Sequence, residues 1–136
     1  MIIANWKCNG SIEMYKSWSA DFSKDLLLND DTYLGLAPPS IYFGDIKSYL
    51  TCIPFIGVQD VDFLNGPRTG SISVDMLVDI ACNFSIVGHS ERRQLFNENN
   101  ELIKKKIESL NNRIMTVLCI GETKEENQKD STKNIL

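Results

Sequence analysis

Residues 114–121 read IMTVLCIG, an almost wholly apolar run that ends at a glycine. Four similar runs precede it, at residues 2–7, 33–37, 53–59 and 84–88. Continuous apolar runs of this length are typical of strands buried on both faces, as the strands of parallel sheets are. The sequence therefore predicts five strands, the last over residues 114–120, in a parallel sheet.

Helical patterns fill the intervals between these runs. They cover residues 11–28, 40–50, 74–81 and 101–110, with Ser11 and Ser73 as N-caps and a lysine-rich outer side on the last. Alternating strands and helices are typical of right-handed βαβ units, with helices covering a parallel sheet. Two α/β architectures fit this pattern: an open doubly wound sheet and part of a closed (β/α)₈ barrel. The chain has no glycine-rich dinucleotide fingerprint and no Walker A motif.

Composition excludes several classes of protein. The 136 residues suffice for one domain, with 43% hydrophobic and 24% charged residues and a net charge of −4. Without a long basic run, the chain has no electrostatic footprint for nucleic acid, and no apolar run approaches the roughly 20 residues of a membrane span. The four cysteines and single histidine lack metal-site spacing, so we expect reduced, structural thiols, no metal and a cytoplasmic protein.

Two groups of polar residues follow predicted strands. Asn5 and Lys7 lie two residues apart, so strand alternation predicts that both point to one face at the end where parallel α/β folds bind ligands. A cation beside an amide suits a small polar anion, although a solvated lysine after a strand fits the same spacing.

The second group contains the only histidine, His89, between an apolar strand and a predicted helix start. A helix N-terminus disfavours added positive charge, so we expect a neutral imidazole able to donate a hydrogen bond to a carbonyl and to move protons. Glu91 would order the site or take part in proton transfer, while Arg92 and Arg93 would form structural ion pairs. A histidine satisfied by backbone hydrogen bonds is the alternative.

Four segments resemble the triosephosphate isomerase family, in the family's order and spread over the chain. Residues 4–10 (ANWKCNG) are similar to its opening, residues 87–93 (VGHSERR) to its histidine segment and residues 118–123 (LCIGET) to its fifth strand. The fourth segment is in two pieces, residues 57–60 (GVQD) and 66–70 (GPRTG), which resemble its third loop, the one that forms the dimer interface.

The resemblance implies that residues 1–136 form the N-terminal part of a TIM (β/α)₈ barrel, strands 1–5 with their helices, within a single domain. It implies interconversion of dihydroxyacetone phosphate and glyceraldehyde 3-phosphate in glycolysis and gluconeogenesis, without cofactor or metal, by a cytoplasmic homodimer. By the resemblance, Asn5 and Lys7 bind the triose phosphate, and Lys7, His89 and Glu91 are catalytic. Thr69 and Gln59 would lie at the dimer interface, and Glu98 would be structural.

The chain also departs from the family pattern. The family's catalytic base, a glutamate after the sixth strand, has no counterpart, and neither do the lid and the later phosphate-gripping loops. Residues 122–136 enter a further helix without a C-cap, with residues 132–136 competent to form it, so the chain reads as interrupted.

We therefore expect a chain that is inactive alone and that is marginally stable or self-associated, because its edge strands lack neighbours. Arg68, Ser71 and Asp60 differ from the residues that the family usually carries in its third loop, which affects the dimer contacts. A non-catalytic half-barrel or assembly partner, and another phosphosugar-binding barrel, are the alternative functions.

Overall fold

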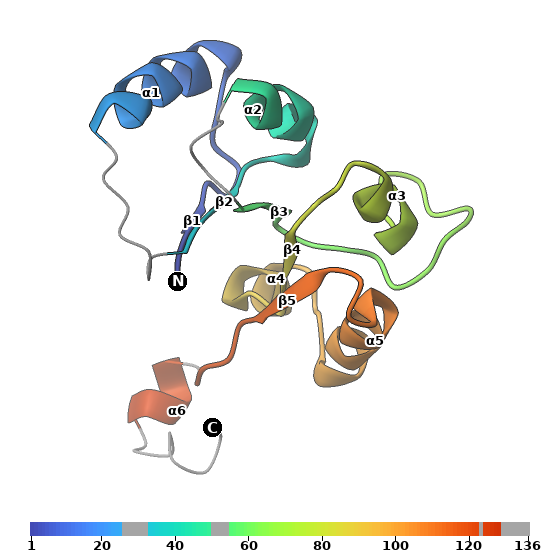
Figure 1. Ribbon diagram of the computed structural model, residues 1–136. Helices are drawn as coiled ribbons and strands as arrows, with labels where there is room; N and C mark the ends of the chain where they lie inside the picture. The colour runs from blue at the N-terminus through green and yellow to red at the C-terminus, as the bar shows by residue number, and fades with distance from the viewer. Residues whose placement is uncertain (26–32, 50–54, 123, 129–136) are drawn as a thin grey trace.

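The structure, a computed structural model, describes residues 1–25, 33–49, 55–122 and 124–128 (Figure 1). Five strands form one parallel sheet in the order β1-β2-β3-β4-β5. The strands are β1 (Ile2–Asn5), β2 (Leu34–Ala37), β3 (Phe55–Val58), β4 (Phe84–Val87) and β5 (Met115–Leu118). A doubly wound sheet reverses its strand order, whereas a barrel adds each strand beside the previous one. The sequential order therefore confirms a curled half-barrel.

Helices occupy every interval between neighbouring strands. They are α1 (Ile12–Asp25), a 3₁₀ turn η1 (Ser40–Tyr42), α2 (Phe43–Tyr49), α3 (Val74–Asp79), α4 (Ser90–Leu95), α5 (Asn100–Leu110) and, after β5, α6 (Lys124–Gln128). The β4–β5 connection contains two helices: α4 begins at the helix start predicted after His89, and α5 covers the pattern predicted over residues 101–110. Asn97 adopts a left-handed φ of 55° between them, and the Asn99 side chain then caps α5 by accepting a hydrogen bond from the Leu102 N–H at 2.9 Å.

Most elements are shorter than the sequence predicts. The first strand ends at Asn5 rather than at residue 7, and the fifth covers 115–118 rather than 114–120. Ser11 and Ser73 cap α1 and α3 as predicted, with their hydroxyls 3.0 Å and 3.4 Å from the amides of Met14 and Met76. The predicted start of the third strand, the end of the first helix and the helical residues 132–136 lie outside the described residues.

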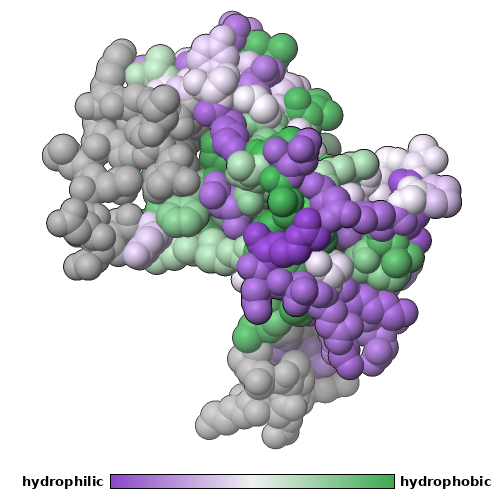
Figure 2. Space-filling view, turned by 45° about the vertical axis from the view of Figure 1, so that its right-hand side comes forward, coloured by the Kyte–Doolittle hydropathy of each residue, from purple (hydrophilic) through white to green (hydrophobic). Residues whose placement is uncertain are grey.

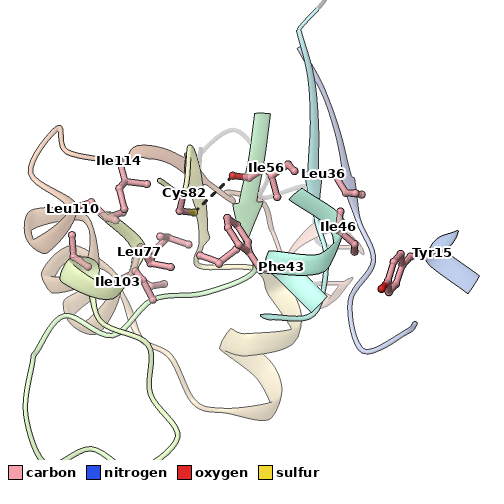
Figure 3. Close-up of a cluster of buried hydrophobic side chains, with 14 residues drawn as sticks. Tyr15, Leu36, Phe43, Ile46, Ile56, Leu77, Cys82, Ile103, Leu110 and Ile114 are labelled. Carbon is pink, nitrogen blue, oxygen red and sulfur yellow. Dashed lines mark hydrogen bonds between the residues drawn. The ribbon is translucent and has the colours of Figure 1, made fainter. Parts of the chain in front are cut away.

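The main hydrophobic core lies between the sheet and the helices, and Figure 3 shows side chains from both layers meeting there. Helix residues and strand residues contribute together: Tyr15, Phe43, Ile46, Leu77, Ile103 and Leu110 from helices, with Leu36, Ile56 and Val58 from strands. Cys82 joins this core, and its Sγ lies 3.8 Å from the Ile56 carbonyl oxygen. Burial of these apolar side chains is the main force that holds the helices on the sheet.

The opposite face of the sheet has a separate, smaller core. Ala37, Phe84 and Ile86 are its buried members, and the side chains packed against them also come from strands or strand ends. The Phe84 ring lies over two glycines of neighbouring strands, since a Cβ on Gly57 would fall 2.4 Å from that ring and one on Gly35 would fall 3.0 Å from it. Glycine at these positions therefore lets the large ring fill the concave side of the sheet.

The two outermost strands of the sheet are the most exposed. Within the described chain β1 pairs only with β2, and β5 pairs only with β4. Ile2 of β1 is 62% exposed and Leu118 of β5 is 45% exposed, whereas every residue of β4 is buried. Figure 2 shows hydrophobic residues (green) between hydrophilic ones (purple) on one face of the molecule. Apolar side chains are therefore exposed on both edge strands, while the expected self-association stays a prediction.

Candidate active site

The candidate site lies at the C-terminal ends of β1 and β4. In parallel α/β barrels the residues that follow the strands gather at one end of the sheet, where ligands bind. The curl of the sheet brings the end of β1 close to the end of β4, since Lys7 Nζ lies 2.7 Å from Glu91 Oε1. Of the residues predicted from the sequence, Lys7, His89 and Glu91 thus come together, and Asn5 contacts Lys7.

Lys7 enters the site from a turn. Its φ is 53°, in the left-handed region that residues with a Cβ seldom adopt. The Asn5 Oδ1 accepts a hydrogen bond from the Lys7 N–H at 2.9 Å, and Gln59 Nε2 donates one to the Lys7 carbonyl at 2.9 Å. Asn5 and Lys7 are in contact, but strand alternation does not bring them together, so that part of the prediction is wrong. The strand ends at Asn5, and the turn brings the Lys7 ammonium to Glu91.

Lys7 and Glu91 form a half-exposed ion pair, with side-chain exposures of 50% and 45%. The hydrogen bond from Lys7 holds the pKa of the Glu91 carboxyl below its ordinary value, against a smaller opposite effect of burial. Glu91 is therefore ionised at neutral pH. Of the two roles predicted for it, ordering the site fits this pairing better than accepting a proton.

The His89 imidazole is oriented by the first residues of α4. Its Nδ1 accepts a hydrogen bond from the Glu91 backbone N–H at 3.3 Å and thereby caps the helix. The same Nδ1 lies 3.4 Å from Glu91 Oε2, a contact that would be an ion pair only with a protonated ring. Because a backbone N–H can only donate, the Nδ1 that it binds must be an acceptor without a proton. We therefore favour the neutral ring, with its proton on Nε2. That nitrogen is then a hydrogen-bond donor at the site.

Arg93 fixes the backbone on which His89 sits. Its Nε donates to the Gly88 carbonyl at 2.7 Å and its Nη2 to the Cys119 carbonyl at 3.3 Å, so it links the ends of β4 and β5. Gly88 has φ of 72°, and a Cβ there would lie 3.0 Å from Arg93 Nη2. Glycine is therefore favoured at this position, because a side chain would be strained by the backbone and would displace Arg93. The ion pair predicted for Arg93 is wrong among the described residues, because carbonyls and the Asn100 amide oxygen are its partners.

A buried charge network lies behind α4. Arg92 binds Asp60 at 2.9 Å and Glu98 at 2.7 Å, and Lys106 Nζ lies 2.6 Å from Asp60 and 2.5 Å from Glu98. The structural roles predicted for Arg92 and Glu98 are supported by these contacts. Lys106 was predicted to lie on the outer side of its helix, yet it is 4% exposed. Its spacing of three from Ile103 was the sequence signal that places it on the buried stripe.

A cavity of about 250 Å³ adjoins the imidazole. It is lined by Gly88, His89, Ser90, Arg93 and residues 119–122. A larger cavity of about 500 Å³ is lined by the charge network and by the loop that carries Arg68, and neither Lys7 nor His89 lines it. We place the candidate site beside the smaller cavity, because His89 lines it. Lys7 and Glu91 line neither cavity, but they contact each other next to His89.

The two residues predicted for the dimer interface lie on the connection from β3 to α3. Thr69 is exposed between two left-handed glycines, Gly66 and Gly70. Gln59 is half-buried, and its amide nitrogen donates to the carbonyls of Lys7 and Ala37 within the chain. Their assignment to a subunit interface stays a prediction.

The part of the chain that the structure describes also bears on metal binding, membrane insertion and thiol chemistry. Within them no group of three His, Cys, Asp or Glu side chains is arranged to hold a metal ion. No described helix has the length and apolar character needed to cross a membrane. Of the described cysteines, Cys8 is exposed, Cys82 is buried and Cys119 is half-buried, and all three are free thiols.

Known proteins match this chain along its whole length. Residues 1–136 match the family model described as Triosephosphate isomerase. The chain belongs to the triosephosphate isomerase family. A protein named triosephosphate isomerase from Baumannia cicadellinicola is 44% identical over 139 aligned positions, and those from Photorhabdus laumondii and Erwinia tasmaniensis are each 37% identical over 138.

Coverage is unequal in these comparisons. Each alignment includes 99% of this chain and 54% of the relative, so the chain spans about half the length of the curated triosephosphate isomerases it matches. The resemblance stated from the sequence motifs is thereby confirmed at the level of the family. The segments that carry it, around Lys7, His89 and Cys119, are also those that the fold brings together at one end of the sheet.

Proposed function

We propose that residues 1–136 are the N-terminal part of a single triosephosphate isomerase barrel, which interconverts dihydroxyacetone phosphate and glyceraldehyde 3-phosphate. The observation that carries this proposal is the contact of Lys7 with Glu91, beside His89, in a chain of this family. The contact joins two segments 84 residues apart at the end of the sheet where substrates bind in such barrels.

Each residue then has a role set by its chemistry. The Lys7 ammonium, half-exposed and paired with Glu91, offsets the negative charge of the triose phosphate, and Asn5 contributes to the same binding region. His89, neutral with its proton on Nε2, donates to the substrate carbonyl and polarises it; this neutral-imidazole chemistry is the one already described for triosephosphate isomerases. Glu91 is the third predicted catalytic residue, and it holds the Lys7 ammonium in place. The reaction needs neither a cofactor nor a metal.

We infer that the 136 residues alone do not isomerise. The family resemblance assigns the catalytic base to a glutamate after a sixth strand, and Glu91, one of the carboxylates at the described site, is bound to Lys7. General-base catalysis contributes about 10²–10⁴-fold, which corresponds to several kcal/mol of activation free energy. The proposed assembly is a cytoplasmic homodimer in which Thr69 contacts a second subunit.

An isomerase assay tests this proposal. The chain would be assayed alone and after refolding with the C-terminal half of the Baumannia cicadellinicola relative, with that half alone as the control. We expect activity only from the mixture. A folded, inactive mixture that binds dihydroxyacetone phosphate would favour the non-catalytic half-barrel, and one that binds another sugar phosphate instead would favour a different phosphosugar-binding barrel. Activity of the chain alone would contradict the assignment of the base.

A further inference from the structure

The backbone of Lys7 adopts a conformation that does not form by default. A φ of 53° places the Cβ of an L-residue close to backbone atoms, so such a residue persists only where its surroundings hold it. The backbone N–H of Lys7 donates to the side-chain oxygen of Asn5, two residues before it. The carbonyl of Lys7 is bound from a different strand, by Gln59, which follows the last residue of β3.

Gln59 uses both hydrogens of its amide at this point. Nε2 lies 2.9 Å from the Lys7 carbonyl oxygen and 3.0 Å from the Ala37 carbonyl oxygen, at the end of β2. The same Ala37 oxygen accepts the Trp6 backbone N–H at 3.1 Å. The Ala37 carbonyl and the Gln59 side-chain amide therefore hold Trp6 and Lys7 against β2 and β3.

The direction of the Lys7 side chain depends on these hydrogen bonds from Gln59. An extended residue at this position would continue the strand, whereas the left-handed turn turns the chain and brings Nζ to 2.7 Å from Glu91 Oε1. Because the ammonium and carboxylate are both half-exposed, their attraction is screened by water and does not by itself fix the backbone. The two hydrogen bonds from the half-buried Gln59 hold the Lys7 backbone.

We propose that Gln59 is a positioning residue for Lys7: its amide fixes the left-handed backbone turn that places the lysine ammonium beside Glu91 at the substrate site. This inference rests on the proposed function for its meaning in catalysis. It is separate from the interface role that the family resemblance implies for Gln59, which the two bonds within the chain do not test.

The experiment replaces Gln59 with methionine, which has similar length and no donor, in the 136-residue chain. The readout is the ¹³C NMR titration of the Glu91 carboxyl group, whose pKa is held down by Lys7. Lys7→Met gives the full upward shift of this pKa. We expect Gln59→Met to give more than half of that shift, because the ammonium leaves the carboxylate when the turn is released.

A matched control is available elsewhere in the chain. Lys47 Nζ also donates to two backbone carbonyls, those of Ile80 and Ala81 at 2.7 Å and 2.9 Å, and Ala81 is also left-handed, with φ of 51°. Lys47→Met therefore removes a similar pair of bonds far from the site. We expect it to lower the urea midpoint as Gln59→Met does while leaving the Glu91 titration unchanged.

The Glu91 titration requires no substrate, so its result can be interpreted even if the isomerase assay is negative. If Gln59→Met unfolds the chain, Gln59→Asn, whose shorter amide cannot reach both carbonyls, decides the question, and a smaller upward shift supports the proposal. The proposal is overturned if the folded variant titrates as the unmodified chain does. It is equally overturned if neither variant folds, since Gln59 would then serve the fold as a whole.

Discussion

Lys7 and His89 contribute to the site in different ways, and their replacement separates binding from chemistry. In the chain completed by the C-terminal half of a relative, we expect Lys7→Met to abolish measurable activity through loss of the positive charge proposed to bind the substrate. His89→Gln keeps a donor group but cannot move a proton, so kcat should fall by about 10²–10⁴-fold. Steady-state kinetics would measure both variants.

The control for these variants is Lys104→Met. Lys104 is 68% exposed and pairs with Glu108 at 3.9 Å on the surface of α5, where an ion pair contributes little. Its replacement removes the same charge and should leave the rate within a factor of two or so. Full activity in either Lys7→Met or His89→Gln would show that the site residues are wrongly assigned.

The reactivity of the cysteines follows from their surroundings. Burial raises the pKa of the Cys82 thiol to about 11, and its Sγ lies 3.2 Å from the Phe84 carbonyl oxygen. At pH 8 about one thiol in a thousand is then ionised, and the side chain is also inaccessible. We expect iodoacetamide to label the exposed Cys8 well before Cys82, as measured by peptide mass spectrometry of the native protein. Equal labelling of the two would contradict the packing of Cys82 in the core.

At the scale of a single element, α5 depends on a charge buried within it. The Lys106 and Glu98 side chains are 5% and 3% exposed, and their contact is 2.5 Å. Lys106→Met leaves Asp60 and Glu98 to share Arg92, so one negative charge is left uncompensated. We expect the free energy of unfolding to fall by about 3 kcal/mol, the lower end for a broken buried pair. Urea denaturation would measure this loss.

The matched double variant is Lys106→Met with Glu98→Leu. It removes both charges and leaves Arg92 paired with Asp60, so most of the lost stability should return, because a buried pair replaced by apolar groups is often neutral. A double variant that is less stable than Lys106→Met would show that the carboxylate of Glu98 is needed for another reason.

The same network gives a dependence on pH. Burial raises the pKa of Glu98, but the bonds from Lys106 and Arg92 outweigh it, and the net pKa lies below the ordinary value. A lowered acid pKa stabilises the folded state above the unfolded-state pKa, and this contribution is lost as pH falls through the folded-state pKa. Asp60, whose pKa is raised chiefly by burial, acts in the opposite sense. Glu98→Gln should therefore weaken the acid-side loss of stability below about pH 4. An unchanged acid-side loss in this variant would contradict the network.

The existence of a strand or helix could be predicted from the sequence where one physical signal dominates, but the residues at which it begins and ends could not. The continuous apolar runs identified all five strands because burial on both faces requires them. The end of β1 depends on the Asn5 side chain binding the Lys7 amide, a contact that periodicity does not encode. The six-residue α4 is too short for a periodic pattern, and Lys106 was misplaced because its buried partners come from elsewhere in the chain.

In the site, too, some residues could be predicted from the sequence and others could not. Motifs located Lys7, His89 and Glu91, since the residue types themselves carry the chemistry, and the fold then brought them within contact distance. The residues that hold them were assigned other roles or none. Gln59 and Arg93 act through backbone carbonyls of distant strands, and any residue type can supply a carbonyl, so no sequence pattern marks such a partner.

At the scale of the whole molecule, the open sheet sets the behaviour of the 136-residue chain. β1 and β5 each pair with one described strand, and apolar side chains such as Ile2 and Leu118 are exposed on them. Exposed parallel edges offer unpaired backbone groups and apolar surface to another chain. We expect self-association at micromolar concentrations and above, measured by size-exclusion chromatography with light scattering.

A charge at the edge strand tests whether β5 carries this association. Leu118→Lys places a charge on β5, whereas Met76→Lys makes the same change of net charge on α3, where Met76 is 59% exposed. Only Leu118→Lys should shift the mass distribution toward the monomer of 15.4 kDa, because a charge at an edge strand disfavours pairing with a second chain. Equal effects of the two variants would assign the association to net charge. A monomeric unmodified chain with a cooperative thermal transition would show that the open edges are stable in water.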